Sequence, residues 1–347
     1  MASAAAVALD WPRIMNTGSM RIDPYAMCEA ARQTGTNRFS HSTGIHLEGE
    51  PPGCYHRAEM NPWIGFNKSP ALAAASILFA GSVSAAESTA DALMNQAQAA
   101  QLKGERVEAL SLAGKALAAD PKNPQCYFVR GTFYAANGQH DKAVTDFGDA
   151  IKLEPRGAAL YQLRGLEHFK LGHIQESIAD FDKYLEFVPK QAPHHWQRGI
   201  SLYYAGRYDE GRRQFETHQT VNPSDVENAV WHYLCVARAS GLDKARAALI
   251  DIKEDRRVPM MQVHALYSGK GGAEEVLSAA RAGDPPAARL QEQLFYAHLY
   301  LGLYYEAAGN DTLAREHIFK AADDYKTDHY MGDVARVHAG QLRQPKK

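Results

Sequence analysis

The sequence predicts an all-α fold, a solenoid of about seven helical hairpins plus a C-terminal capping helix. Four prolines recur at intervals of 34 residues, at 121, 155, 189 and 223. A glycine lies seventeen residues before each of them, at 104, 138, 172 and 206. No stretch alternates apolar and polar residues for long enough to indicate a sheet. A fixed period of this length is typical of stacked helix–turn–helix units.

The regular repeats occupy residues 86–225, in units that begin at 90, 124, 158 and 192. In the second unit, Tyr127, Gly131 and Tyr134 follow the spacing i, i+4, i+7 and form one stripe on the first helix. A second stripe, which includes Phe147, runs along the second helix with the same spacing. The two stripes face each other, and Gly131 is small because the helices approach closely there.

Glycine and proline mark the ends of each predicted helix. Gly138 ends the first helix of its unit, where a left-handed backbone conformation is favoured. Pro155 ends the second helix, because proline lacks an amide donor and clashes inside a helix. Each unit is therefore a helical hairpin with defined ends.

These residues resemble the motif of the tetratricopeptide repeat (TPR) family. The unit at 158 carries Tyr161, Gly165 and Phe181 at the motif positions, and the first unit has Ala97 in place of the inner glycine. The resemblance implies a right-handed solenoid that binds a protein or peptide partner in a concave groove. A weak first unit is expected at the end of a repeat array.

The repeat motif weakens in residues 226–294 and returns in residues 295–347. The first of these segments is predicted to contain degenerate TPR-like hairpins with the same helical periodicity. In the second segment, Gly302, Tyr305 and Gly309 restore the motif. A last helix from Gly332 to Gln341 is predicted to cover the open end of the stack.

The N-terminal 85 residues have a different character from the repeats. Residues 1–59 show no helical or strand periodicity, and we interpret them as a non-native or disordered extension. Residues 60–85 contain a ten-residue apolar run from 71 to 80, followed by small residues before Ala85. This pattern is typical of a secretory signal peptide that begins at Met60, with an internal linker helix as the alternative. Cleavage near Ala85 would make the protein periplasmic or secreted.

Composition and motifs exclude several classes of protein. A net charge of −2 without a basic block argues against nucleic acid as a partner. The apolar run is too short for a stable membrane span. The four cysteines lack the CxxC spacing of a structural metal site, and the residues of a catalytic, metal or cofactor motif are absent. We therefore predict a non-enzymatic protein without a cofactor, in which Cys126 and Cys235 are buried free thiols.

A second stripe on the first helices supplies the candidate binding site. Repeat positions 5, 9 and 12 are also spaced i, i+4, i+7, one face around from the packing stripe. In the TPR family this face lines the concave groove, and its aromatic residues suit a peptide anchor site. We expect the side chains to be partly buried, with packing between neighbouring repeats as the alternative. The predicted groove residues are Phe128, Thr132, Gln162, Leu166, Phe169, Trp196, Ile200 and Tyr203.

An export signal combined with such repeats resembles the NlpI-type bacterial envelope proteins, although this chain lacks their lipidated cysteine. That resemblance implies an adaptor that joins peptidoglycan hydrolases to a protease, often as a homodimer. The alternative is a structural module of the envelope that self-associates through its aromatic C-terminal hairpin. The residues of that hairpin are Phe295, Tyr296, Tyr300, Tyr304 and Tyr305. An enzyme of another type is a distant third interpretation.

The first testable prediction concerns the start of the mature chain. If Met60 is the translation start and export removes everything before Ala86, the native protein should begin at Ala86. N-terminal sequencing and peptide mapping of the native protein measure this directly. Peptides from residues 1–59 in the mature species would contradict it.

Overall fold

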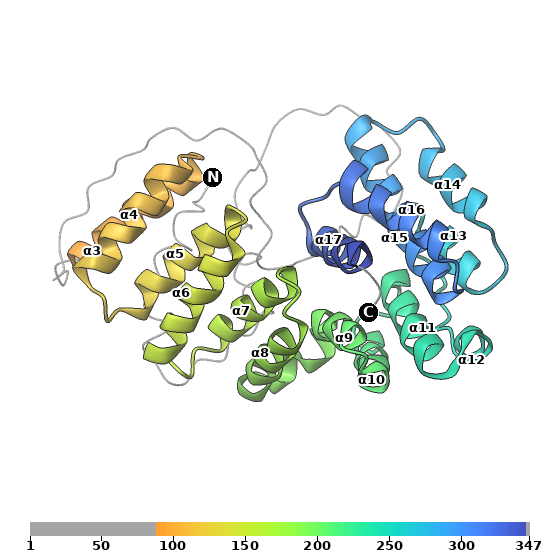
Figure 1. Cartoon of the computed structure of the whole chain (residues 1–347), viewed down its shortest axis with the longest axis horizontal. Helices are drawn as coiled ribbons and strands as arrows, with labels where there is room; N and C mark the ends of the chain where they lie inside the picture. Colours follow the sequence, from red (N-terminus) through yellow and green to blue (C-terminus); the bar gives the residue numbers. More distant parts are fainter. Residues whose placement is uncertain (1–87, 345–347) are drawn as a thin grey trace, which may run out of the picture. The chain divides into compact units, whose positions relative to one another are not determined.

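The computed structural model describes residues 88–344, which form helices, turns and loops and contain no strand (Figure 1). The predicted extension at 1–59 and the predicted signal peptide at 60–85 lie outside these residues. Between 88 and 344 the chain forms seven helical hairpins and a final helix. The predicted all-α solenoid is confirmed.

The first four hairpins follow the predicted units. The fourth begins late, because Pro189 and Pro193 hold residues Pro189–His194 in a 3-10 turn and the first helix starts at Trp196. The helices are α3 (Thr89–Leu102), α4 (Arg106–Ala119), α5 (Pro124–Ala136), α6 (His140–Leu153), α7 (Ala158–Lys170), α8 (Ile174–Phe187), α9 (Trp196–Tyr204) and α10 (Tyr208–Gln219).

The later hairpins are less regular in length. One second helix has only six residues, and the first helix of the last hairpin has 21. The elements are α11 (Val226–Ser240), α12 (Leu242–Ala247), α13 (Met260–Tyr267), α14 (Ala273–Arg281), α15 (Ala287–Ala307), α16 (Asp311–Phe319), the π-helical turn η2 (Lys320–Asp324) and α17 (Tyr330–Arg343).

Close contact between a glycine and a phenylalanine joins the helices of a hairpin. A Cβ atom placed on Gly165 would lie 2.8 Å from the ring of Phe181, and one on Gly199 would lie 2.7 Å from Phe215. Both rings are buried. The ring thus packs directly against the glycine, as the sequence predicts for Gly131.

An ion pair across each of two hairpins accompanies this contact. Arg130 donates two hydrogen bonds to Asp146, and Arg164 binds Asp180 in the same way, with N–O distances of 2.7 and 2.8 Å. Both carboxylates are nearly inaccessible to solvent. A bidentate pair of this kind fixes the position of one helix along the other. The sequence analysis did not single out this pair.

The apolar core is divided into three clusters along the chain. The first, around α3 to α5, contains mostly alanine side chains together with Cys126. The second centres on Phe147, and the third runs from Phe169 to Ala339 and contains Cys235. Both cysteines are free and buried, as predicted.

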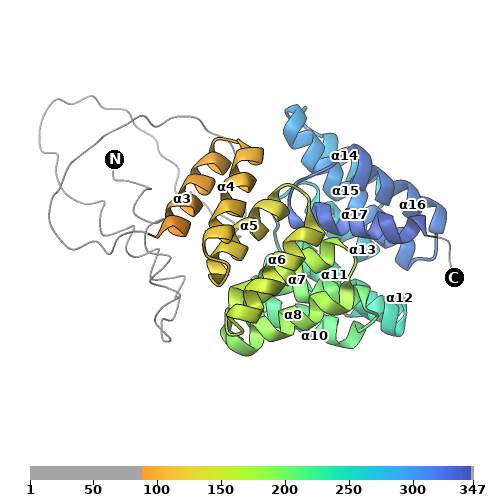
Figure 2. The ribbon, with the colours of Figure 1, turned by 60° about the vertical axis from the view of Figure 1, so that its left-hand side comes forward.

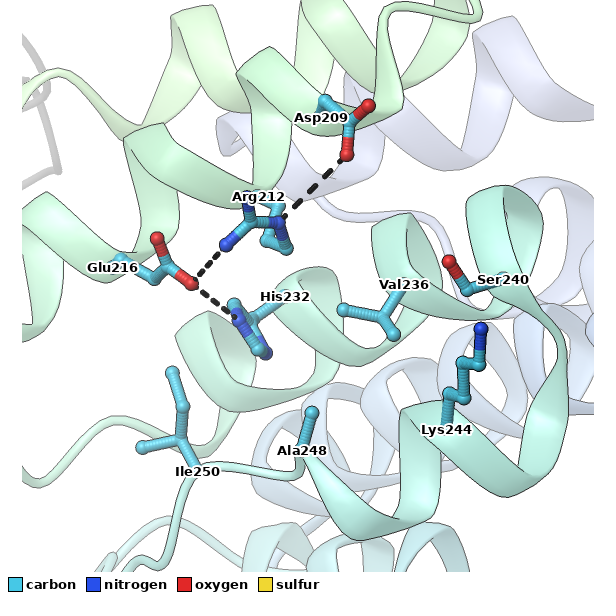
Figure 3. A pocket seen from close by; sticks show the side chains of 9 residues that line it. All are labelled: Asp209, Arg212, Glu216, His232, Val236, Ser240, Lys244, Ala248 and Ile250. Atoms are coloured by element: carbon cyan, nitrogen blue, oxygen red, sulfur yellow. Dashed lines mark hydrogen bonds and ion pairs between the residues drawn. The ribbon is translucent and has the colours of Figure 1, made fainter.

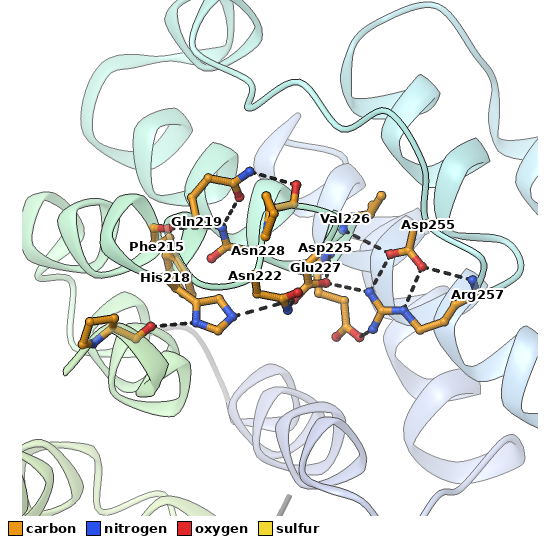
Figure 4. A network of polar contacts seen from close by, with 12 residues as sticks. Phe215, His218, Gln219, Asn222, Asp225, Val226, Glu227, Asn228, Asp255 and Arg257 are labelled. Atoms are coloured by element: carbon orange, nitrogen blue, oxygen red, sulfur yellow. Dashed lines mark hydrogen bonds and ion pairs between the residues drawn. The ribbon is translucent and has the colours of Figure 1, made fainter. Parts of the chain in front are cut away.

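A cluster of charged residues around Arg257 lies at the end of the regular repeats (Figure 4). Its guanidinium binds Asp225 and Asp255, each at 2.6 Å, and also Glu227. Asp255 in turn accepts a hydrogen bond from the amide of Val226 at 3.2 Å. Burial opposes ionisation of Asp255, but the hydrogen bond and charge of Arg257 keep its pKa below the ordinary value. Arg257 therefore ties the start of α11 to the loop before α13.

The final helix α17 does more than cover the end of the stack. It packs on α16 and η2, as a cap would, but it also contacts α7 (Figures 1 and 2). The prediction that α17 covers the open end of the stack was therefore incomplete, because it did not include the contact with α7. Eight of the 14 residues of α17 are buried, which requires neighbours on more than one side of the helix.

The glycine–phenylalanine contact predicts the effect of adding one methyl group. Gly165→Ala should lower the free energy of unfolding by about 1–3 kcal/mol, because the buried ring of Phe181 cannot move away. Gly114→Ala in α4 is the matched control, since a Cβ there meets no atom within 4 Å. That variant should be neutral or slightly stabilising. Equal stabilities in urea unfolding would contradict the packing described here.

Candidate protein-interaction groove

The predicted groove residues lie on three successive first helices. Phe128 and Thr132 are on α5, and the remaining six are divided equally between α7 and α9. Five of the eight are partly buried, as expected of a groove that retains some access to solvent. These five are Phe128, Thr132, Gln162, Leu166 and Trp196.

The expectation of partial burial was wrong for Phe169, Ile200 and Tyr203, which are 0%, 1% and 5% exposed. Different neighbours cover Tyr203 and Phe169. The ring of Tyr203 packs edge-on against Trp231 of α11 at 5.4 Å, which is contact between repeats. Phe169 is instead covered by α17, whose first residue, Tyr330, stacks on it at 5.2 Å. The final helix thus covers the part of the stripe that contains Phe169.

Tyr330 is the apolar anchor of α17 in the groove. Its ring lies between Phe169 of α7 and Trp196 of α9, and it meets Trp196 edge-on at 5.1 Å. Stacked and edge-on aromatic pairs add to the stabilisation from burial alone. Tyr330 is 5% exposed. Two predicted groove residues therefore bind a helix of the same chain.

His338 is the polar anchor of α17 and connects it to α9 and α15. Its Nδ1 lies 2.9 Å from the hydroxyl of Tyr204, and its Nε2 lies 3.3 Å from Oε2 of Glu306. The other oxygen of Glu306 is 3.0 Å from Arg238 of α11. Arg238 in turn donates to the hydroxyl of Tyr203 at 3.3 Å. Side chains from four helices thus meet in one polar cluster.

Glu306 is the negative centre of this cluster. Burial alone would raise its pKa, but the imidazole of His338, 3.3 Å away, and the charge of Arg238 lower it to about 2. The carboxylate is therefore ionised at neutral pH. The sequence analysis did not identify Glu306, His338 or Tyr330, which are brought together from segments far apart in the chain.

Gln162 is occupied within the fold. Its Oε1 lies 2.6 Å from Nε2 of His195, which also packs against Phe181 at 4.6 Å. Nδ1 of His195 accepts a hydrogen bond from the amide of Arg198 at the start of α9. Burial lowers the pKa of His195 to about 3, so the imidazole is neutral. His195 therefore has a packing role in the fold.

A second surface feature is a hollow of about 550 Å³ between α10, α11 and α12 (Figure 3). The charged side chains on α10 bind one another: Arg212 pairs with Glu216 at 2.5 Å and lies 3.9 Å from Asp209. Glu216 also lies 3.4 Å from His232. Lys244 of α12 also lines the hollow, so its charges are paired with one another only in part.

Two other kinds of site are missing from residues 88–344. No three His, Cys, Asp or Glu side chains come together as a metal site requires. Of the helices in this range, none is both long and apolar enough to cross a membrane.

The aromatic C-terminal hairpin is largely part of the core. Phe295 and Tyr300 are fully buried, and the hydroxyl of Tyr300 donates to Glu227. Tyr296, Tyr304 and Tyr305 are partly buried. A surface for self-association would therefore have to use the last three.

Comparison with known families identifies the repeats. Residues 112–145 and 158–190 match models described as tetratricopeptide repeat. These two segments are similar to tetratricopeptide repeats. The second match covers α7 and α8, the unit predicted to begin at 158. Among curated proteins, no relative matches this sequence.

Several solved structures are similar to part of this chain. YrrB, described as a TPR protein with an unusual peptide-binding site, is 21% identical over 53% of this chain and 94% of its own, with a TM-score of 0.46. The MamA protein is 18% identical over 52% and 93%, with a TM-score of 0.44. A repeat protein from Parabacteroides merdae is 20% identical over 75% and 86%, with a TM-score of 0.44. Likeness at this level carries no information on function.

The polar cluster predicts a specific dependence of stability on pH. Because the pKa of Glu306 is lower in the fold than its ordinary value of 4.5, the carboxylate stabilises the fold above that pH. The contribution, roughly 3 kcal/mol, should be lost as the pH falls towards 2. Glu306→Gln should be less stable than wild type at pH 7, and the gap should shrink by more than half at pH 3.

Urea unfolding at the two pH values measures this gap. Glu254→Gln, at an exposed glutamate, is the control and should show no gap at either pH. A gap for Glu306→Gln that does not change with pH would contradict the assignment.

Proposed function

We propose that this protein is a non-enzymatic interaction scaffold that binds a segment of a partner protein along the concave stripe of α5, α7 and α9. One observation carries the proposal: the stripe already holds a helix, because Phe169 and Trp196 bind Tyr330 of α17. A surface that packs against one helix offers the shape and the apolar contacts that a partner helix or extended peptide needs.

The part of the stripe on α5 and α7 is the proposed contact for the partner. Phe128, Thr132 and Leu166 are partly buried there, so their side chains retain area that a partner can cover. Aromatic side chains are enriched in protein interfaces, and burial of a phenylalanine or leucine side chain is favourable by about 1.5–3 kcal/mol. Tetratricopeptide repeats at 112–145 and 158–190 are consistent with this role.

We also propose that the scaffold acts in the bacterial cell envelope, in the periplasm or after secretion. The support is the apolar run at 71–80 and the small residues before Ala85, which have the pattern of an export signal. The resemblance to NlpI-type proteins suggests an adaptor for envelope enzymes as the specific role. Fractionation of the native cells, with detection of the protein in the periplasm or the medium, tests the location.

The interaction proposal predicts the effect of removing two side chains. Phe128→Ala together with Leu166→Ala should reduce capture of the partner at least tenfold, because anchors of this type each contribute about 2 kcal/mol. Crosslinking pull-down from the envelope fraction measures capture. The matched control is Leu153→Ala, at a leucine that is 43% exposed on α6. A control as weak as the double variant, or a folded double variant with full capture, would contradict the proposed site.

A further inference from the structure

The concave face holds α17 through two side chains placed at a defined spacing. We propose that this part of the groove is an exchangeable helix-binding site. Its ligand class is a helix with an aromatic residue in its first turn and an imidazole eight residues later. In this view α17 is the resident occupant, and a partner helix of the same chemistry replaces it. The inference rests on the proposed function, since it names the partner chemistry for the same stripe.

The spacing of the two anchors follows from helix geometry. Tyr330 and His338 are eight residues apart, which corresponds to about 12 Å along a helix and slightly more than two turns. Both side chains therefore lie on similar faces of α17. Tyr330 enters the aromatic site formed by Phe169 and Trp196, and His338 reaches Tyr204 and Glu306.

The polar end of the groove selects for a hydrogen-bond donor or a cation. Glu306 is a partly buried carboxylate, and Arg238 pairs with one of its oxygens. The other oxygen, Oε2, faces His338. A helix that brings an apolar side chain to this position would remove the imidazole that lies 3.3 Å from that oxygen and leave the carboxylate facing an apolar group, which is unfavourable. Charge complementarity therefore restricts the ligand to a helix with an imidazole or another basic group there.

The attachment of α17 to the rest of the chain favours exchange. The connecting residues 325–329 form neither helix nor strand. Within the described residues, Oγ1 of Thr327 and Nε2 of His329 are buried without a hydrogen-bond partner. At the far end of α17, Arg343 pairs with Asp323, and both side chains are about half exposed. Exposed pairs of this kind contribute little to stability.

Gly332 offers a way to loosen α17 without changing the groove. A Cβ atom on Gly332 would lie 2.3 Å from the backbone oxygen of Thr327, in the connection that precedes the helix. Gly332→Ala therefore forces α17 away from its own connection. A separate peptide with the sequence Tyr330–Arg343 lacks Thr327 and is free of this clash.

The test measures binding of that peptide, carrying a fluorescent label, to the full chain by anisotropy. The Gly332→Ala chain should bind the peptide at least tenfold more tightly than the wild-type chain, because the resident helix competes less well. Adding Trp196→Ala to this chain should remove the gain. Peptides with Tyr330→Ala or His338→Ala should each bind at least tenfold more weakly. A folded Gly332→Ala chain that does not bind the peptide, or binds all three peptides equally, would overturn the proposal.

A second measurement covers the case in which Gly332→Ala does not fold. A specific protease site placed between residues 325 and 329 converts α17 into a non-covalent ligand after cleavage. The cleaved protein should keep its other helices by circular dichroism and should exchange α17 for the labelled peptide. Unfolding after cleavage, or retention of α17 against excess peptide, would show that α17 is a permanent part of the core and would overturn the proposal.

These experiments are independent of the cellular partner, because they use only this chain and a peptide from it. The pull-down with Phe128→Ala and Leu166→Ala tests a different part of the stripe. Failure of exchange with a positive pull-down would refute the ligand class for the α17 section alone. Exchange with a negative pull-down would refute the proposed function and leave the helix-binding chemistry of the groove established.

Discussion

The structure depends first on the close approach of two helices within each hairpin, with a glycine on one and a phenylalanine ring on the other. Gly165 and Phe181 show the contact, and the same pair of residue types recurs one repeat later at Gly199 and Phe215. A contact repeated at a constant interval gives successive hairpins similar geometry. Their first helices then present equivalent positions to one side, which is how a stripe of binding residues arises.

Charge plays two different roles on this scaffold. In the hairpins, Arg130 and Arg164 pair with a buried aspartate and set the alignment of two neighbouring helices. At the groove, Glu306 joins helices that are distant in sequence, because Arg238 and His338 approach it from α11 and α17. The first kind of pair is local and repeated. The second kind joins helices that are far apart in the sequence.

The repeat part of the fold could be predicted from the sequence because its information is local. The 34-residue period and the positions of Gly131 and Phe147 are enough to define a hairpin and its packing stripe. The groove could be predicted in part, since Phe128 and Leu166 lie where the period places them and are partly buried. The covering of Phe169 by Tyr330 could not, because no period relates residues 161 positions apart.

The uneven filling of the core gives the two ends of the chain different resistance to opening. The cluster around α3 to α5 is built mostly from alanines, whereas the third cluster contains Trp231, Tyr267 and many large aliphatic side chains. Small side chains bury less apolar area, so the N-terminal hairpins are held by a smaller free energy. Cys126 lies in the first cluster and Cys235 in the third, and burial raises the pKa of both thiols. Each region thus contains one thiol that is unreactive while it is buried. The order in which Cys126 and Cys235 become reactive to alkylation reports which end of the solenoid opens first.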